Sequence, residues 1–289
     1  MKVLFIVNPI AGINRKVDLS DLIRSGMGPD HTTDIALTER AGHATILAKE
    51  AARNGYDAVI AVGGDGSMNE VASGLAGTST ALGLLPCGSG NGLARHLKIP
   101  LKLKQAVALI NGKHSIRQID AGKVNEHYFF SVAGIGFDAL ISREFAKHKG
   151  RGLITYIRSI LKNITSYQAR SYTIEIDGQH REVKAKFIAL ANSKQYGNNF
   201  LIAPDASVTD GLLDICLIRS FSDLLRPGPM ISYLTGGYYK NISVHTLKMK
   251  NAMISASENL EAHVDGEPIE TGKEVKVVVL EGALKVITA

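Results

Sequence analysis

The sequence predicts an α/β domain followed by a mainly antiparallel β-sandwich domain. Before Asp120, continuous apolar runs alternate with helical patterns, which is typical of a parallel sheet covered on both faces. After it, short β runs are separated by turn residues such as Asp265-Gly266, which is typical of a sandwich or barrel. We therefore expect domains at 1–121 and 122–289.

The first domain should contain four strands, each an apolar run that ends at turn residues. These strands are KVLFIVN (2–8), TTDIALT (32–38), YDAVIAVGG (56–64) and TALGLLP (80–86). A helix should follow each strand, with Gly55 and Gly77 marking the ends of two of them. The helices are DLSDLIRSG (18–26), HATILAKEAARNG (43–55), SMNEVASGLAG (67–77) and LKLKQAVALINGK (101–113).

The second domain should consist of short strands with helical segments between them. The strands are HYFFSVAG (127–134), SYTIEIDG (171–178), EVKAKFIALAN (182–192), LLDICLI (212–218), NISVHTLKMK (241–250), AMISAS (252–257), LEAHVDG (260–266), EVKVVVLEG (274–282) and ALKVIT (283–288). Helices are expected near 138–148 and 152–167 and over part of 222–236.

Composition narrows the class of protein. The 289 residues are 45% hydrophobic, and no apolar run is long enough to span a bilayer. Nothing in the sequence suggests secretion, so we expect a protein of the reducing cytoplasm. Cys87 and Cys216 form no cluster of metal ligands. A net charge of +6 favours anionic partners, while the lack of basic clusters interleaved with aromatic residues argues against a nucleic-acid platform.

The stretch VGGDGSMNEV, residues 62–71, follows the third expected strand and raises the central question of function. Ligands bind at the carboxyl ends of strands in open parallel sheets, and glycines let backbone N–H groups approach a phosphate. Ser67 is expected to cap the helix that follows. Because Asp65 would repel a bare phosphate, we expect it to act through magnesium or a donor group of the ligand.

Three similar turns follow the other strands: NPIAG (8–12), TERAGHA (38–44) and PCGSGNGLAR (86–95). Four phosphate-compatible turns at one edge of a sheet predict a nucleotide cleft that is neither a P-loop nor a dinucleotide fingerprint. Arg95 is a further candidate for holding phosphates. His43 is expected to begin a helix and hydrogen-bond the loop rather than act as a base.

These segments, together with APDASVTDGLLDI (203–215) and HVDGEPI (263–269), resemble the lipid kinases that share the diacylglycerol kinase catalytic domain. That family includes bacterial diacylglycerol kinases and the sphingosine and ceramide kinases. The resemblance covers essentially the whole chain. It implies an α/β domain similar to those of phosphofructokinases and NAD kinases, then a β-sandwich-like domain, with the last strand packing back on the first domain.

The resemblance also implies roles for individual residues. Glu267 matches the general base of the family, and Asp65 its essential acid in the glycine loop. Ser207, Asp210 and Leu212 correspond to a magnesium site. The implied ATP site consists of Asn8, Pro9, Ile10, Ala11, Gly12, Thr38, Gly64, Asp65, Gly66, Ser67, Met68, Asn69, Glu70 and Ser89.

The expected function is therefore magnesium-dependent phosphate transfer from ATP to a lipid hydroxyl, with transient contact of the protein with the membrane surface and a homodimer as one possible assembly. The GSGN sequence at 88–91 looks more like the sphingosine and ceramide kinases than like bacterial members, which leaves the acceptor lipid open. The apolar stripe of 152–167 suits either a membrane surface or the protein core. Two alternatives are a NAD kinase-like enzyme and a non-catalytic nucleotide or lipid sensor.

Overall fold

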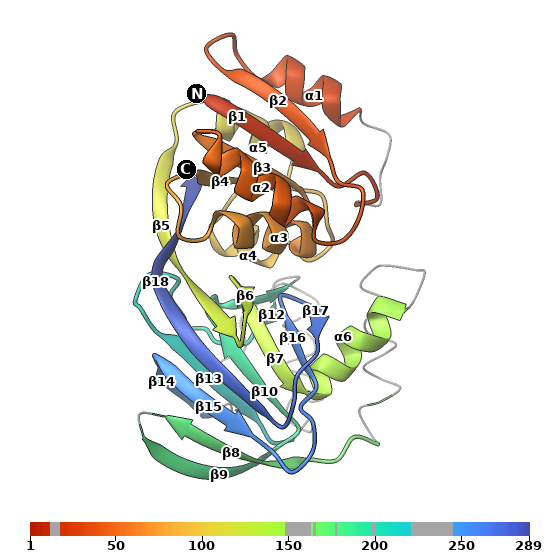
Figure 1. The fold of residues 1–289 in the computed structure, drawn as a ribbon, viewed down its shortest axis with the longest axis vertical. Helices are drawn as coiled ribbons and strands as arrows, with labels where there is room; N and C mark the ends of the chain where they lie inside the picture. The colour runs from red at the N-terminus through yellow and green to blue at the C-terminus, as the bar shows by residue number, and fades with distance from the viewer. Residues whose placement is uncertain (12–17, 148–162, 164–165, 177, 198–199, 221–244) are drawn as a thin grey trace. The chain divides into compact units, whose positions relative to one another are not determined.

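The computed structural model describes residues 1–289 except 12–17, 148–162, 164–165, 177, 198–199 and 221–244 (Figure 1). The chain divides into two compact units, one of Met1–Ala121 with Glu281–Ala289 and one of Gly122–Leu280. Strands β5 (Ser115–Val124) and β18 (Glu274–Thr288) contribute residues to both units. The end of the last strand thus belongs to the first unit, while the remainder belongs to the second.

The first unit contains a parallel sheet in the order β2-β1-β3-β4-β18. Its strands are β1 (Lys2–Val7), β2 (Thr32–Leu37), β3 (Ala58–Gly63), β4 (Ala81–Pro86) and the end of β18. All residues of β3 and β4 are buried, as expected of central strands that are covered on both faces.

Helices cover both faces of this sheet (Figure 1). They are α1 (Leu19–Gly26), α2 (His43–Arg53), α3 (Asp65–Leu75), α4 (Gly92–His96) and α5 (Leu103–Asn111). On one face, Ile23 of α1 and Val107 of α5 pack in the same core as Phe5 of β1. On the other, α2 and α3 pack so closely that a Cβ at Gly74 would lie 2.7 Å from Ala48.

The second unit is a sandwich of antiparallel sheets. One sheet has the order β14-β13-β10-β7-β16-β17, and the other continues from β18 through β15 and β8 to β9. Their strands are β7 (Val132–Gly136), β8 (Arg170–Ile176), β9 (Gln179–Ala185), β10 (Phe187–Ala191), β13 (Leu213–Ile218), β14 (His245–Met249), β15 (Asn251–Ser255), β16 (Ala262–Val264) and β17 (Glu267–Ile269). Short strands β6 (His127–Phe129), which pairs with β5, and the β11 (Gln195–Gly197) and β12 (Phe200–Leu201) pair complete the unit.

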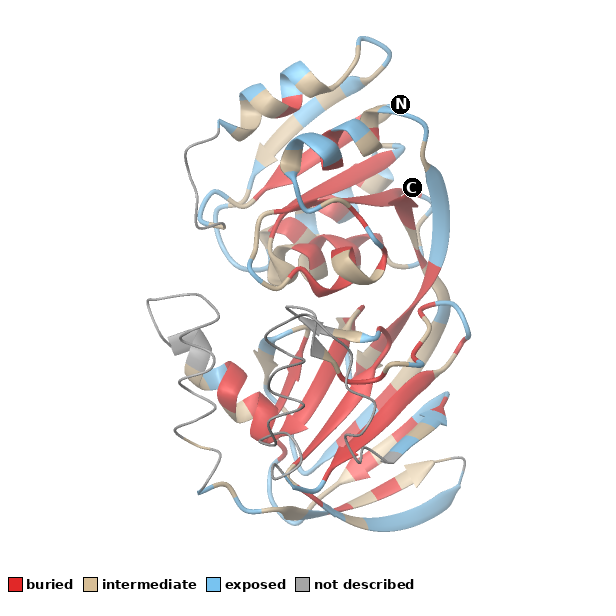
Figure 2. Ribbon diagram, turned by 180° about the vertical axis from the view of Figure 1, so that it is seen from behind, coloured by how far each residue is buried: buried red, intermediate tan, exposed pale blue. Residues whose placement is uncertain are grey.

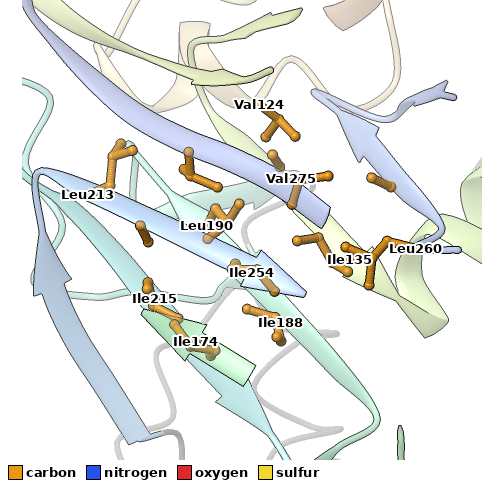
Figure 3. Close-up of a cluster of buried hydrophobic side chains, with 14 of the residues drawn as sticks. Val124, Ile135, Ile174, Ile188, Leu190, Leu213, Ile215, Ile254, Leu260 and Val275 are labelled. Atoms are coloured by element: carbon orange, nitrogen blue, oxygen red, sulfur yellow. The ribbon is translucent and has the colours of Figure 1, made fainter. Parts of the chain in front are cut away.

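Apolar side chains from both sheets form the core of the sandwich, where Ile188 and Ile215 lie near Ile174 and Ile254 (Figure 3). The opposite face of the six-stranded sheet is also covered, because α6 (Phe137–Lys147) packs on β7, β16 and β17. Strands β7, β10 and β13 are buried along their whole length (Figure 2), and Ile202, Ala203 and Ala206 join the apolar cluster on this face. This architecture confirms the expected α/β domain followed by a β-sandwich.

Several elements differ from the sequence expectation. The stretches 274–282 and 283–288 form one continuous strand, β18, in which Gly282 adopts a positive φ of 56°. Strand β5 and the short helix α4 were not expected. The expected helix at 222–236 lies outside the described residues, as does most of the one at 152–167. Among the residues that are described, no helix combines the length and hydropathy needed to cross a bilayer.

Candidate active site

The carboxyl ends of the first four strands lie at one edge of the parallel sheet. Val7 is in register with both Leu37 and Val62, and Gly63 is in register with Pro86. The turns that the sequence singled out therefore start side by side, as Figure 1 shows for the ends of β1 and β2. This edge brings together Asn8, Thr38, the 64–70 segment and the 87–91 segment.

Helix α3 begins two residues earlier than the sequence suggested, since Asp65 is its first residue and Gly64 its N-cap. The expectation that Ser67 caps this helix was wrong, because Ser67 already lies inside the first turn. Its hydroxyl instead accepts a hydrogen bond from Asn8 Nδ2 at 3.0 Å. Ser67 therefore connects the turn after β1 to the start of α3.

The Asp65 carboxylate holds the loop that follows β4. Its Oδ2 accepts a hydrogen bond from the Asn91 N–H at 2.8 Å, and its Oδ1 accepts one from the Gly92 N–H at 2.7 Å. Both donors stand at the start of α4, where an anion is favoured by the unpaired N–H groups of the helix. Asp65 thus fixes one glycine-rich loop relative to the other through charge-assisted hydrogen bonds.

Two glycines of the loop after β4 are required by close approach. A Cβ at Gly88 would lie 2.6 Å from Gly64 Cα, and a Cβ at Gly90 would lie 2.5 Å from Asp65 Oδ2. Asn91 closes the second loop, because its side chain accepts from the Gly88 N–H at 3.1 Å and donates to the Gly88 carbonyl at 2.7 Å. The segments 63–66 and 87–91, which we call the paired glycine loops, therefore form one backbone-to-backbone unit.

Three further side chains lie on or beside the second loop. Ser89 is exposed, and Arg95 Nε donates to the Gly90 carbonyl at 2.9 Å. Burial raises the pKa of the Cys87 thiol to about 11, so the thiol remains neutral at ordinary pH. The second loop therefore exposes the Ser89 side chain, and the Cys87 thiol near it carries no charge.

Other expected ATP-site residues have different surroundings. Met68 is buried in the core with 2% exposure, and the Glu70 carboxylate accepts from the Ala44 N–H at 3.1 Å, at the start of α2. His43 begins α2 and its Nδ1 accepts from the Glu39 N–H at 3.2 Å, which confirms its structural interpretation.

The turn after β1 is more open. The side chain of Asn8 also accepts from the Ile10 N–H at 3.1 Å, and both Pro9 and Ile10 are exposed. Gly12 lies outside the described residues. The remaining candidates on the first unit are half-buried; they are Ala11, Thr38, Gly64, Gly66 and Asn69.

In the second unit, Glu267 is exposed and is the first residue of β17. It follows a tight turn in which Asp265 and Gly266 both have positive φ, of 48° and 89°. Strand β16 precedes this turn and pairs with β17, with Val264 opposite Glu267. The DGE sequence is therefore a hairpin turn that presents a carboxylate to solvent.

Asp265 holds this turn in place, a role that the sequence did not reveal. Its carboxylate accepts hydrogen bonds from three successive main-chain N–H groups, those of Phe130, Ser131 and Val132, at 2.9, 2.9 and 3.0 Å. These donors come from the segment that leads into β7. The only sequence signal at Asp265 is the Asp-Gly pair, which predicts a turn but not the hydrogen bonds that its carboxylate accepts.

The expected metal-binding residues Ser207, Asp210 and Leu212 lie in one turn before β13. Asp210 Oδ1 accepts from the Leu212 N–H at 3.2 Å, and Ser207 Oγ accepts from the Thr209 N–H at 3.3 Å. Asp210 Oδ2, however, lies 2.6 Å from Lys248 Nζ. A positive charge from the chain itself therefore already occupies this carboxylate.

Lys248 also approaches Asp214, its cross-strand partner in β13, at 3.7 Å. Burial raises the pKa of Asp214 and Lys248 opposes that shift, while the hydrogen bond to Asp210 raises the pKa of Lys248. Within the described part of the chain, no three His, Cys, Asp or Glu side chains are grouped to hold a metal ion. The ammonium group of Lys248 therefore neutralises Asp210 in this arrangement, and a magnesium ion at Ser207, Asp210 and Leu212 stays a prediction.

Comparisons with known families match the chain in two parts, which correspond to the α/β unit and the sandwich. Residues 2–124 match the profile of the diacylglycerol kinase catalytic domain. Residues 131–288 match the profile of the YegS C-terminal NAD kinase β-sandwich-like domain. Both matches agree with the α/β unit and the sandwich described above.

Similar proteins and solved structures extend this similarity to nearly the whole chain. The chain is 32% identical to a diacylglycerol kinase of Bacillus subtilis, over 91% of this chain and 88% of that protein. It is 33% identical to a "probable lipid kinase YegS-like" protein of Pectobacterium atrosepticum, over 96% and 95%. A crystal structure of a "putative diacylglycerol kinase" from Bacillus anthracis superposes with a TM-score of 0.80 at 25% identity, covering 100% of this chain and 96% of that one.

Proposed function

Because the chain belongs to the diacylglycerol kinase family of lipid kinases, we propose that it transfers the γ-phosphate of ATP to a primary hydroxyl of a membrane lipid. The acceptor is diacylglycerol or a sphingoid or ceramide-type lipid. The name of the Bacillus subtilis relative supports diacylglycerol, and the GSGN sequence at 88–91 favours a sphingoid or ceramide-type lipid.

The paired glycine loops carry this proposal. Gly64 and Gly88 are in backbone contact and Asp65 anchors the second loop, so the loop backbone at the ends of β3 and β4 is held in one arrangement beside which a phosphate can bind. Phosphoryl transfer depends mainly on such positioning and on neutralising charge. Asp65 acts here as a positioning residue for the nucleotide loop.

Glu267 supplies the base. The lipid hydroxyl loses its proton to the Glu267 carboxylate as its oxygen attacks the γ-phosphorus, and the bond from that phosphorus to the bridging oxygen breaks to release ADP. An exposed carboxylate on a turn that three hydrogen bonds hold suits this task, because it is accessible and fixed at once.

Magnesium, bound with ATP, would offset the charge on the transferred phosphate. Because Lys248 already neutralises Asp210, we place the required ion with the nucleotide phosphates rather than at Asp210. The net charge of +6 favours transient contact with an anionic bilayer, where the lipid acceptor resides.

The test is phosphate transfer from radiolabelled ATP to a panel of lipids in mixed micelles with magnesium. Glu267→Gln should lower kcat about 10²–10⁴-fold, the usual contribution of a general base, and leave KM for ATP nearly unchanged. Glu270→Gln is the matched control, since Glu270 is an exposed acid only three residues away. Asp65→Ala should instead raise KM for ATP, because the second glycine loop loses its anchor.

Other outcomes separate the alternatives. Transfer to NAD but to no lipid would establish a NAD kinase-like enzyme. ATP binding without transfer to either would indicate a nucleotide or lipid sensor. Full activity of Glu267→Gln would leave the lipid kinase in place and reject Glu267 as its base.

A further inference from the structure

A buried histidine–aspartate pair lies directly behind the turn that carries Glu267. His263 of β16 and Asp138 of α6 are 125 residues apart in the sequence, and their side chains are only 3% and 7% exposed. His263 Nε2 is in hydrogen-bond contact with Asp138 Oδ2. Burying polar groups this deeply costs free energy of desolvation, which indicates that the pair does more than fill space in the core.

The second ring nitrogen of His263 reaches the turn itself. Nδ1 accepts a hydrogen bond from the Gly266 N–H at 3.1 Å. An accepting Nδ1 carries no proton, so the proton of the neutral ring is on Nε2 and is donated to Asp138. Asp138 therefore selects the tautomer that can bind the turn.

Strand β7 is shaped around this pair. Gly134 stands opposite His263 in the register of β7 and β16. A Cβ at Gly134 would lie 2.5 Å from Asp138 Oδ2 and closer still to His263 Nε2. Any side chain at this position would displace the pair, so the glycine keeps its space open.

The turn is thus held from two directions. Asp265 binds the backbone leading into β7, and Gly266, held by His263, is the residue immediately before Glu267. Both turn residues adopt left-handed backbone angles, a conformation that is uncommon for aspartate and needs support from its surroundings.

We propose that His263, oriented by Asp138, is a positioning residue that fixes the Glu267 carboxylate through the Gly266 N–H. This inference rests on the proposed function, in which Glu267 is the base. Without the acceptor at Nδ1, the Gly266 N–H loses its partner and the turn samples other conformations. The carboxylate then occupies its reactive position for a smaller fraction of the time.

Two isosteric variants separate the two contacts of the ring. The amide of Gln reaches the position of Nε2, so His263→Gln keeps a polar partner for Asp138 and loses the acceptor for Gly266. The amide of Asn ends near the position of Nδ1, so His263→Asn keeps the acceptor for Gly266. His180→Leu is the control, because His180 is an exposed histidine of the same unit.

The first readout is hydrogen exchange of the main-chain amides of 263–268. We expect His263→Gln to exchange at least tenfold faster at Gly266 than the wild type, and His263→Asn and His180→Leu to stay within about twofold. Unchanged exchange at Gly266 in His263→Gln would overturn the proposal. This measurement does not depend on any activity.

The second readout is a double-mutant cycle with Glu267→Gln. In the wild-type background, His263→Gln should lower kcat at least tenfold with little change in KM for ATP, and His263→Asn should restore most of it. In the Glu267→Gln background, His263→Gln should cause no further loss, because its effect passes through the carboxylate. An equal loss in both backgrounds would overturn the positioning role while leaving the lipid kinase intact.

The two failures are distinguishable. If the wild type transfers phosphate to no lipid, the proposed function fails and the positioning role falls with it. If the wild type is active and Glu267→Gln is not, an additive cycle rejects only the role of His263.

Discussion

Asp65 and Asp265 perform similar tasks in the two units, yet only one of them is recognisable from the sequence. Each is an aspartate whose carboxylate accepts hydrogen bonds from consecutive main-chain N–H groups, two for Asp65 and three for Asp265. Each thereby fixes a segment that carries a candidate functional group. Backbone amides at a fixed carboxylate are a stable, charge-assisted arrangement.

The difference lies in what surrounds the two residues. Asp65 follows Gly64, against which the backbone of Gly88 lies, and its donors follow only 26 and 27 residues later. Asp265 lies in a common turn sequence, and its donors are 133 to 135 residues earlier in the chain. A local steric requirement leaves a sequence pattern, whereas a long-range hydrogen bond leaves none.

The largest expected effect is that of Asp265→Ala. Three main-chain N–H groups lose their acceptor beside the buried residues Phe130 and Val132, so the free energy of unfolding should fall by about 2–4 kcal/mol. Urea denaturation measures this loss. Glu182→Ala, which removes an exposed acid of the same unit, should change it by less than about 0.5 kcal/mol. Equal stability of the two variants would show that Asp265 does not hold the turn.

A smaller effect, confined to the first unit, is expected for Gly88→Ala. The added methyl group would lie 2.6 Å from Gly64 Cα, so the paired glycine loops must separate and the affinity for ATP should fall at least tenfold. Isothermal titration calorimetry with ATP measures this change. Gly272→Ala is the matched control, because a Cβ there meets nothing within 4 Å. Unchanged ATP affinity in Gly88→Ala would mean that contact of the two loops is not needed for nucleotide binding.

The smallest effect concerns the cation at Asp210. Lys248→Met removes a partly exposed pair with Asp210 and the cation beside buried Asp214, and should lower stability by about 1 kcal/mol. Millimolar Mg²⁺ should raise the Tm of this variant and leave those of the wild type and of the control Lys276→Met unchanged. A saturable rise of the wild-type Tm would show that a divalent ion binds there despite Lys248.

The order of the first four strands and of helices α1, α2, α3 and α5 followed from the sequence, because each of these elements is formed by neighbouring residues with one dominant period. The short helix α4 and strand β5 did not. The positions of both glycine loops followed as well, but the sequence assigned their glycines to a phosphate and did not reveal that Gly88 packs against Gly64. The same local reasoning failed at the end of the chain, where two expected strands are the single strand β18. Its length depends on partners in distant parts of the chain, namely β4, β5 and β15.

The sequence by itself thus determined the fold class and the edge of the sheet where the candidate nucleotide site lies, while Glu267 became a candidate base only through the resemblance to the lipid kinases. The tertiary structure alone decided the long-range contacts of the second unit. These are the three N–H groups that donate to Asp265, the His263–Asp138 pair and the contact of the Lys248 ammonium with Asp210. The physical reason is that spacing and steric exclusion act between neighbours in the chain. Hydrogen bonds and ion pairs join whichever groups folding brings together, and their partners here lie 38 to 135 residues apart.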